Sequence, residues 1–425
     1  MAASDSISSI ASSLLAQKSM RLVSWQPIQT LWAGYGHICR LIAASDMSSS
    51  INSPFPSLPT CPRDSGTISD PSGLLESETL ILKLISPPPA DRHSNEGHVR
   101  KVLSYNVEQY FYTHLAVLMP PDIPVSKCVA SISPSSSQPR NSEAQHETTA
   151  MILTDLRPSF PLAGEKRAEL NQKQVYASLS WLAKFHGFWW SRTRTFDREV
   201  LIRAPLEEVQ RPKTKRTGSS VWLHGGYSYL ATRRAEYASL AEDEDSEWSE
   251  SLCIPSTGQS LSTAEKVAKL LAPQPDGMGV MARYETLIHG DVKSENLFTT
   301  MSGEEVAFYD FQYVGLGLGV CDLAKLFTCS IPLKMLHEDM DIPEELAMQQ
   351  GEKELLQRYQ ETIEQTSGDK YPWDILVKHW ETALVDWLRF QASWGFWGNT
   401  EWLEARVRYI LKNESWIDWV DATIS

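Results

Sequence analysis

The 425-residue chain has little positive charge for its size: 39 Lys and Arg residues against 53 Asp and Glu give a net charge of −14. Such a balance offers no electrostatic attraction for a nucleic-acid backbone or an anionic lipid surface, so we expect neither as a main partner. The six cysteines form no C-x-x-C pair, and no secretory leader is recognisable. We therefore expect reduced thiols and a cytoplasmic protein.

Long hydrophobic runs are also lacking. The most apolar stretch, residues 22–45, is interrupted by polar residues and proline, so it is not predicted to span a bilayer and no membrane contact is expected. The first twenty residues are rich in serine and poor in acidic residues, as transit peptides are. An amphipathic helix is the favoured interpretation, because the apolar positions there fit helical spacing: Ile7, Ile10, Leu14 and Leu15.

A hydrophobic content of 42% with 22% charged residues is typical of a globular protein with a large core. Apolar residues at every fourth position predict a helix over residues 99–118. Two segments rich in Ser and Pro, residues 44–78 and 130–149, are interpreted as insertions. Short apolar runs bounded by turn residues predict strands at residues 28–31, 38–43, 79–85 and 151–153.

These patterns predict an α+β fold with two lobes. After an N-terminal helix or tail at residues 1–21, residues 22–154 would form a small, mostly antiparallel sheet lobe with one helix. Residues 155–425 would form a larger, mainly helical lobe. The length of the chain agrees with two or three structural units.

The sharpest functional signal is a set of polar residues in the second predicted lobe: Asp291, Asn296 five residues later, and Asp310 after an apolar strand. We expect these side chains to converge, with residues 286–289 and 297–299 forming one strand of a hairpin and residues 306–309 the other. Carboxylate and amide oxygens suit Mg²⁺ when substrate phosphates complete its coordination. Asp291 would then be free to accept a proton from a hydroxyl group, the division of roles that phosphoryl transfer requires.

The run HGDVKSEN followed by YDFQ resembles the aminoglycoside phosphotransferase and choline kinase group of small-molecule kinases. The later run CDLAKLF is most similar to its choline-kinase-like and ecdysteroid-kinase-like branch. The resemblance implies a protein-kinase-like fold and an enzyme that uses ATP and Mg²⁺ to phosphorylate a hydroxyl of a small molecule. It further implies that Asp291 is catalytic and that Asn296 and Asp310 bind the metal.

Four further segments resemble nucleotide-binding elements of that group. TLWAGYGHICRL is similar to the hairpin that covers the nucleotide, ETLILKLISPP to the lysine-bearing strand, SYNVEQYFYTHLA to the glutamate-bearing helix, and MILTDL to the hinge. A lysine within an apolar strand would be costly to bury unpaired, so Lys83 is expected to pair with Glu108. The implied ATP-binding residues are Gly34, Gly36, Lys83, Glu108, Thr154, Asp155 and Leu156.

Two alternatives remain open. A protein Ser/Thr kinase is suggested by the similarity of DVKSEN to D-L-K-P-E-N, but Gly290 and Gln312 depart from the protein-kinase motifs and no A-P-E follows. A nucleotide-binding pseudokinase or scaffold is disfavoured because every charged or amide residue of the motif set is present. The glycine-rich residues 315–319 are expected to be a flexible link before a helix that Asp322 would cap, unless Asp322 braces the catalytic loop.

The acceptor is expected to be a small hydroxyl compound, cationic or aromatic. Four tryptophans spaced seven residues apart predict one stripe along a helix: Trp373, Trp380, Trp387 and Trp394. Core packing is the favoured interpretation of this stripe. The alternative is an aromatic wall near Glu381 and Asp386 that would bind a cationic amine or a ring system, as the resemblance to choline kinases implies. Residues 221–237 are a second candidate wall.

Overall fold

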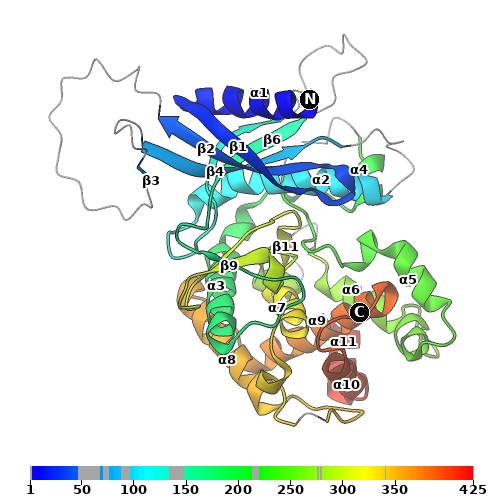
Figure 1. Cartoon of the computed structure of the whole chain (residues 1–425). Coiled ribbons are helices and arrows are strands. Elements are labelled where there is room, and N and C mark those ends of the chain that lie inside the picture. Colours follow the sequence, from blue (N-terminus) through cyan, green and yellow to red (C-terminus); the bar gives the residue numbers. More distant parts are fainter. Residues whose placement is uncertain are drawn as a thin grey trace. The chain divides into compact units, whose positions relative to one another are not determined.

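The computed structural model of the protein describes residues 2–45, 68–69, 76–87, 96–133, 148–212, 220–274, 277, 280–339 and 341–424. The predicted insertions at 44–78 and 130–149 lie largely outside these residues. The chain divides into two compact units (Figure 1). The first comprises Met1–Arg92, Tyr112–Leu118 and Val125–Ser159, and the second comprises His93–Phe111, Met119–Pro124 and Phe160–Ser425.

The first unit is built on an antiparallel sheet with the strand order β1-β2-β4-β6-β5, and a short β3 pairs with β4. Three of the four predicted strand segments lie inside its strands, and residues 28–30 of the fourth end the first strand. The strand at the other end of this order, β5, was not predicted. The strands are β1 (Met20–Thr30), β2 (Gly36–Ser45), β3 (Ile68–Ser69), β4 (Glu76–Ile85), β5 (Cys128–Ile132) and β6 (Thr149–Thr154).

Helix α1 (Ala2–Ala16) covers one face of this sheet, which confirms the amphipathic helix predicted from the apolar spacing (Figure 1). Its apolar side chains share one buried cluster with residues of β2 and β4. The cluster includes Ile7, Ala11, Leu14, Leu15, Cys39, Leu41, Leu80 and Leu82. Burying this stripe against the sheet is what holds a helix of only 15 residues in place.

The second unit is mainly helical, and it includes residues 93–111, which the sequence assigned to the sheet lobe. Helix α3 packs against α8 and also contacts α7 (Figure 1). The helices are α2 (Glu96–Tyr110), α3 (Gln172–Trp190), α4 (Pro205–Gln210), α5 (Arg234–Ala241), α6 (Thr263–Leu271), α7 (Gly319–Cys329), α8 (Gln350–Ser367), α9 (Trp373–Trp394), α10 (Thr400–Leu411) and α11 (Glu414–Ile424). The mixture of antiparallel sheet and helix confirms the α+β class.

Two small sheets position the motif residues. One has the order β10-β9-β7, from β7 (Leu162–Ala163), β9 (Leu297–Thr299) and β10 (Val306–Phe308). The other pairs β8 (Glu285–Ile288) with β11 (Gly315–Leu318). The predicted pairing of β9 with β10 is confirmed, but the prediction that β8 continues into the same hairpin is wrong.

The glycine-rich residues 315–319 are not a flexible link: they form the buried strand β11 and the start of α7. Glycine is needed at these positions because other segments of the same chain lie too close to leave room for a side chain. A Cβ on Gly315 would lie 2.4 Å from the Trp222 carbonyl oxygen, and one on Gly317 would lie 2.9 Å from a side-chain carbon of Ile288. The prediction failed because glycine marks close backbone approach in a strand as well as loops.

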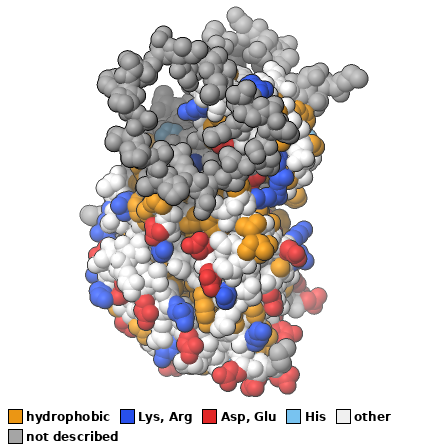
Figure 2. Space-filling view, turned by 60° about the vertical axis from the view of Figure 1, so that its left-hand side comes forward, with side chains coloured by type: hydrophobic (Ala, Val, Ile, Leu, Met, Phe, Trp, Pro, Cys, Tyr) orange, Lys and Arg blue, Asp and Glu red, His pale blue; other side chains and the backbone are white. Residues whose placement is uncertain are grey.

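Among the described helices, none combines the length and the apolar composition that crossing a bilayer demands. On the face shown in Figure 2, acidic and basic side chains of the described residues are interspersed rather than separated into areas of one sign.

Candidate active site

The loop between β8 and β9 brings Asp291 and Asn296 into direct contact. The Asn296 Nδ2 donates hydrogen bonds to the backbone oxygen of Asp291 at 2.8 Å and to its carboxylate Oδ2 at 3.0 Å. Both side chains are buried. Because the amide nitrogen is fixed by these two bonds, the amide oxygen is the atom of Asn296 suited to a metal ion.

Asp322 braces this loop rather than capping its helix. Its carboxylate accepts hydrogen bonds from the backbone N–H groups of His289 at 2.7 Å and Gly290 at 2.8 Å, and from His186 Nε2 at 3.1 Å. The residue at the N-cap of α7 is Leu318, which makes no side-chain capping bond. A single buried carboxylate therefore fixes the two residues that precede Asp291.

His289 connects the loop to the strand that leads to Asp310. Its Nδ1 accepts a hydrogen bond from the backbone N–H of Asp291 at 3.2 Å, so its Nε2 carries the proton and donates to the Tyr309 carbonyl at 2.9 Å. Burial lowers the pKa of His289, which agrees with a neutral ring. This imidazole thus ties the positions of Asp291 and Tyr309 together.

Asp310 follows directly and has a left-handed backbone, with φ of 66°. Non-glycine residues adopt this conformation rarely, and where they do the surroundings hold it. On one side Tyr309 is bound to His289, and on the other Phe311 is buried and stacked on Phe111 of the second unit with ring centroids 3.9 Å apart. The turn at Asp310 is therefore fixed at both ends.

Two lysines contact the Asp291 carboxylate. Lys325 of α7 forms an ion pair with Oδ1, and Lys293 lies 3.3 Å from Oδ2. Burial alone would raise the pKa of Asp291, but these cations hold it well below its usual range, so the carboxylate is ionised. Burial opposes the charge of Lys293 as well, yet Asp291 and Glu295, with a smaller contribution from Asp310, raise its pKa. Lys293 thus forms ion pairs with both Asp291 and Glu295.

The role of Lys325 was not predicted from the sequence. It is 3% exposed on a helix whose neighbouring residues are almost all apolar. The signal that could have found it is the one that singled out Lys83, since a charged side chain within a buried apolar segment needs a partner. Burial lowers the pKa of Lys325, and Asp291 offsets part of that shift.

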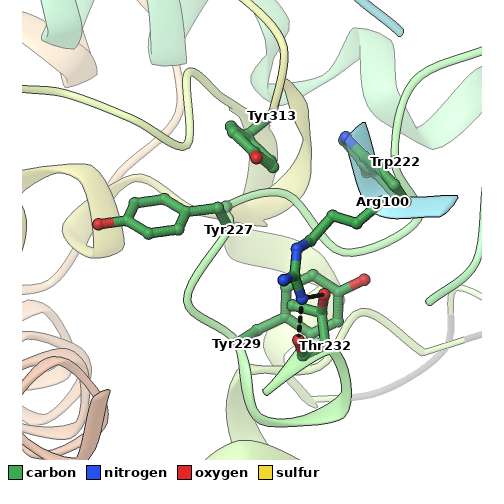
Figure 3. Close-up of a pocket in the computed structure, with 7 residues that line it drawn as sticks. Arg100, Trp222, Tyr227, Tyr229, Thr232 and Tyr313 are labelled. Carbon is green, nitrogen blue, oxygen red and sulfur yellow. Dashed lines mark hydrogen bonds between the residues drawn. The ribbon is translucent and has the colours of Figure 1, made fainter. Parts of the chain in front are cut away.

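Aromatic side chains surround this ion pair. The Lys325 ammonium lies 3.8 Å from the centre of the Tyr227 ring and 5.4 Å from that of Trp387. Tyr227 also lines a small open pocket of about 150 Å³, part of it solvent, in which Arg100 donates hydrogen bonds to Thr232 (Figure 3). The remaining lining residues are Trp222, Gly226, Tyr229 and Tyr313.

The tryptophan stripe on α9 packs into the core at its middle positions, and its role as an aromatic wall for the acceptor stays a prediction. Trp380 is fully buried and donates through Nε1 to Glu352 at 2.7 Å, so it is a core residue. Trp387 is 4% exposed but lies near Lys325, and Trp394 is 53% exposed. The stripe is therefore half-buried at Trp373, buried at Trp380 and Trp387, and exposed at Trp394.

The predicted nucleotide-binding glycines lie in the first unit. Gly34, with φ of 74°, is in the turn between β1 and β2, and a Cβ there would meet nothing within 4 Å. Gly36 begins β2 opposite Ile85, and a Cβ there would lie 1.9 Å from the Leu84 carbonyl oxygen. Strand packing alone therefore accounts for Gly36, whereas Gly34 leaves space beside the backbone.

Lys83 lies on β4, paired with Ile38 of β2 and Met151 of β6, and its side chain is buried. Glu108 is also buried, on α2. Lys83 belongs to the first unit and Glu108 to the second, and the pairing of the two stays a prediction.

The predicted hinge residues follow the end of β6. The Thr154 hydroxyl accepts a hydrogen bond from the backbone N–H of Lys127 at 2.9 Å. The Asp155 carboxylate accepts one from the N–H of Arg157 at 3.0 Å and lies 3.5 Å from Arg40. These side chains shape the turn that also contains Leu156, whose carbonyl accepts a hydrogen bond from the Ser159 N–H at 3.1 Å. The adenine contact of this segment stays a prediction.

A sequence model of the ecdysteroid kinase-like family matches residues 67–343, more than half of the chain. The chain belongs to the ecdysteroid kinase-like family. It is accordingly a kinase-like small-molecule phosphotransferase, and its family implies ATP as co-substrate together with a divalent metal. The match includes the whole stretch from Lys83 to Lys325 described above.

The chain is also similar to several solved structures at low sequence identity. It is 11% identical to a choline kinase from Cryptosporidium parvum, with a TM-score of 0.43 over 99% of this chain and 98% of that one. An ethanolamine kinase from Plasmodium vivax is 12% identical, with a TM-score of 0.34 over 96% and 81%. A choline kinase from Streptococcus pneumoniae is 12% identical, with a TM-score of 0.36 over 99% and 100%. No curated protein gives a sequence match.

Proposed function

We propose that this family member transfers the γ-phosphoryl group of Mg·ATP to a hydroxyl group of a small organic molecule. The observation that carries the proposal is the arrangement around Asp291: an ionised, buried carboxylate on a loop fixed by Asn296, His289 and Asp322. Phosphoryl transfer depends mainly on such positioning and on electrostatic stabilisation, because the protein has little covalent chemistry to perform.

In this proposal Asp291 orients the acceptor hydroxyl and takes up its proton. The pKa of Asp291 is far below neutral, so its carboxylate is a weak base. It would therefore take up the hydroxyl proton late in the reaction, when the new oxygen–phosphorus bond has made that proton acidic. Lys293, whose ammonium lies 3.3 Å from the Asp291 carboxylate, would bind an oxygen of the transferred group. Its positive charge would oppose the negative charge on that group.

The Asn296 amide oxygen and the Asp310 carboxylate would hold Mg²⁺. They fit that ion because both are hard oxygen donors, and a two-ligand site is what Mg²⁺ uses when phosphates and water complete its coordination. Among the described residues no three His, Cys, Asp or Glu side chains cluster as a metal site, so the donor set is of the kind that needs substrate phosphates. The bound metal would neutralise charge on the phosphates.

The ATP itself is proposed to bind with Lys83, oriented by Glu108, against its α and β phosphates. Gly34 and Gly36 would cover the phosphates, and the backbone of Thr154, Asp155 and Leu156 would meet the adenine. The support for this part is the motif set, together with the burial of Lys83 and Glu108 and the open space beside Gly34.

The test is incubation of the purified protein with Mg·ATP and fractionated small metabolites, followed by mass spectrometry for a phosphate-bearing product. We expect such a product, and we expect chelation of the metal to stop its formation. Phosphorylated peptides instead would favour the protein-kinase alternative. Nucleotide binding without a product from any pool would favour a pseudokinase.

Two variants separate the proposed roles. Asp291→Asn is expected to bind Mg·ATP normally and to lose turnover by about 10²- to 10⁴-fold, the usual contribution of a placed general base. Asp310→Ala is expected to lose metal-dependent nucleotide binding, measured by calorimetry with and without Mg²⁺. Asp418→Asn, at an exposed position on α11, is the control and should change neither property. Full turnover by Asp291→Asn would remove Asp291 from its role.

A further inference from the structure

The Lys325 ammonium occupies a site built for a cation. It touches the Asp291 carboxylate on one side, and on the others it lies 3.8 Å from the Tyr227 ring centre and 5.4 Å from the Trp387 ring centre. A carboxylate combined with aromatic faces within about 6 Å is the chemistry by which proteins bind ammonium groups of ligands. Here the cation belongs to the chain itself.

A second cation of the chain covers the outer part of the same aromatic surface. The Arg233 guanidinium lies 5.2 Å from the Tyr227 ring centre, 5.5 Å from that of Phe390 and 5.0 Å from that of Trp394. Arg233 is held there by hydrogen bonds to the Tyr227 carbonyl at 2.7 Å and to Glu236 at 3.2 Å. The aromatic surface from Trp387 to Trp394 therefore already has positive charge over both of its ends.

The acidic side chains beside the tryptophan stripe are also engaged. The Asp386 carboxylate accepts two hydrogen bonds from Arg389, at 2.7 and 3.2 Å. Glu381 is buried, with Arg406 3.9 Å away. Neither carboxylate is placed to balance the charge of an incoming ammonium group, which would instead meet the positive charge of Lys325.

We propose that Lys325 is a specificity-determining residue, whose ammonium takes the place that the positive charge of a cationic acceptor would occupy next to Asp291. The enzyme then rejects cationic amino alcohols and accepts hydroxyl compounds without positive charge. This inference rests on the proposed function, because it concerns the acceptor of that reaction. Of the two acceptor types expected from the sequence, it selects the uncharged one.

The probes are choline and 3,3-dimethylbutan-1-ol, which has the same shape with a carbon atom in place of the charged nitrogen. Binding of each to the full-length protein is measured by ligand-observed NMR titration, with no nucleotide present. We expect the wild-type protein to bind the uncharged alcohol more tightly than choline. Tighter binding of choline by the wild type would overturn the proposal without any variant.

Lys325→Met keeps the length and apolar stem of the side chain and removes its charge. Asp291, Tyr227 and Trp387 would then form a vacant cation site, so choline affinity should rise by at least about tenfold, while affinity for the uncharged alcohol should change little. Lys325→Arg should still reject choline. If Lys325→Met melts far below the wild type, the measurements on Lys325→Arg and on the wild type decide. The proposal is refuted if either of these two proteins binds choline more tightly than the uncharged alcohol.

Lys378→Met is the matched control, because the Lys378 ammonium also lies near an aromatic ring, 5.7 Å from the centre of Trp419, on α9. We expect this variant to keep the wild-type preference, and a switch toward choline would show that Lys325 is not the selective residue. The binding assay involves no phosphoryl transfer. If the protein binds the uncharged alcohol in preference to choline but phosphorylates nothing, the proposed function alone is refuted. If it phosphorylates choline at the same rate as the uncharged alcohol, this inference alone is refuted.

Discussion

Replacement of Asp322 by asparagine tests whether the loop that contains Asp291, the proposed catalytic loop, depends on this one carboxylate. Its two oxygens accept three hydrogen bonds, two from backbone N–H groups of the loop and one from His186. An asparagine has one acceptor oxygen, so in either orientation its NH₂ group faces a backbone N–H. At least one buried donor is then left unsatisfied, at a cost of about 1 to 3 kcal/mol for each, and the other bonds lose the strengthening that the charge provides.

The expected total is about 2 to 5 kcal/mol, which should lower the melting temperature by about 2 to 6 °C. Turnover should fall as well, because His289 and Gly290 directly precede Asp291, and a misplacement of about 1 Å can cost on the order of 100-fold in rate. Thermal unfolding and kcat at saturating Mg·ATP, measured with an identified acceptor, are the assays. Asp418→Asn serves as the exposed control.

An Asp322→Asn variant that melts with the wild type and turns over normally would show that the three hydrogen bonds do not hold the loop. A variant with reduced stability but normal kcat would show that Asp322 supports the core without positioning Asp291. The two measurements therefore separate the structural role of the carboxylate from its proposed role in positioning.

Two further predictions concern charge and backbone. Burial raises the pKa of Glu381 to about 7 in the folded protein, whereas its pKa in the unfolded chain is about 4.3. Between these values the folded protein keeps a proton that the unfolded chain releases, so the free energy of unfolding falls as pH rises. Glu381→Gln should therefore be more stable than the wild type by about 2 to 3 kcal/mol at pH 8, an advantage that shrinks toward pH 5; equal melting at pH 8 would contradict this. Gly290 has φ of 80°, and a Cβ there would lie 2.4 Å from the Tyr313 carbonyl oxygen, so Gly290→Ala should destabilise by at least about 2 kcal/mol more than Gly258→Ala. Gly258 has φ of 84° with no atom within 4 Å of the added Cβ, and equal losses in the two variants would show that backbone strain alone explains Gly290.

Several parts of this protein follow from local sequence. The apolar stripe of α1 and the spacing of the tryptophans on α9 predicted helices that the structure contains, because side chains on one face of a helix must be buried together. The strands at 38–43, 79–85 and 151–153 were equally clear. In contrast, β1 begins at Met20 and is mostly exposed, so it has no apolar alternation to reveal it.

The residues of the proposed catalytic motif were singled out by their order and spacing, and the contact of Asp291 with Asn296 spans only five positions of one loop. What tertiary structure decided is how that loop is held. Asp322 and Lys325 reach it from a helix more than thirty positions away, and Tyr227 approaches Lys325 from a segment almost one hundred positions earlier. No local pattern encodes which buried charges meet, since the cost of burying each one is offset only by a partner that the fold supplies.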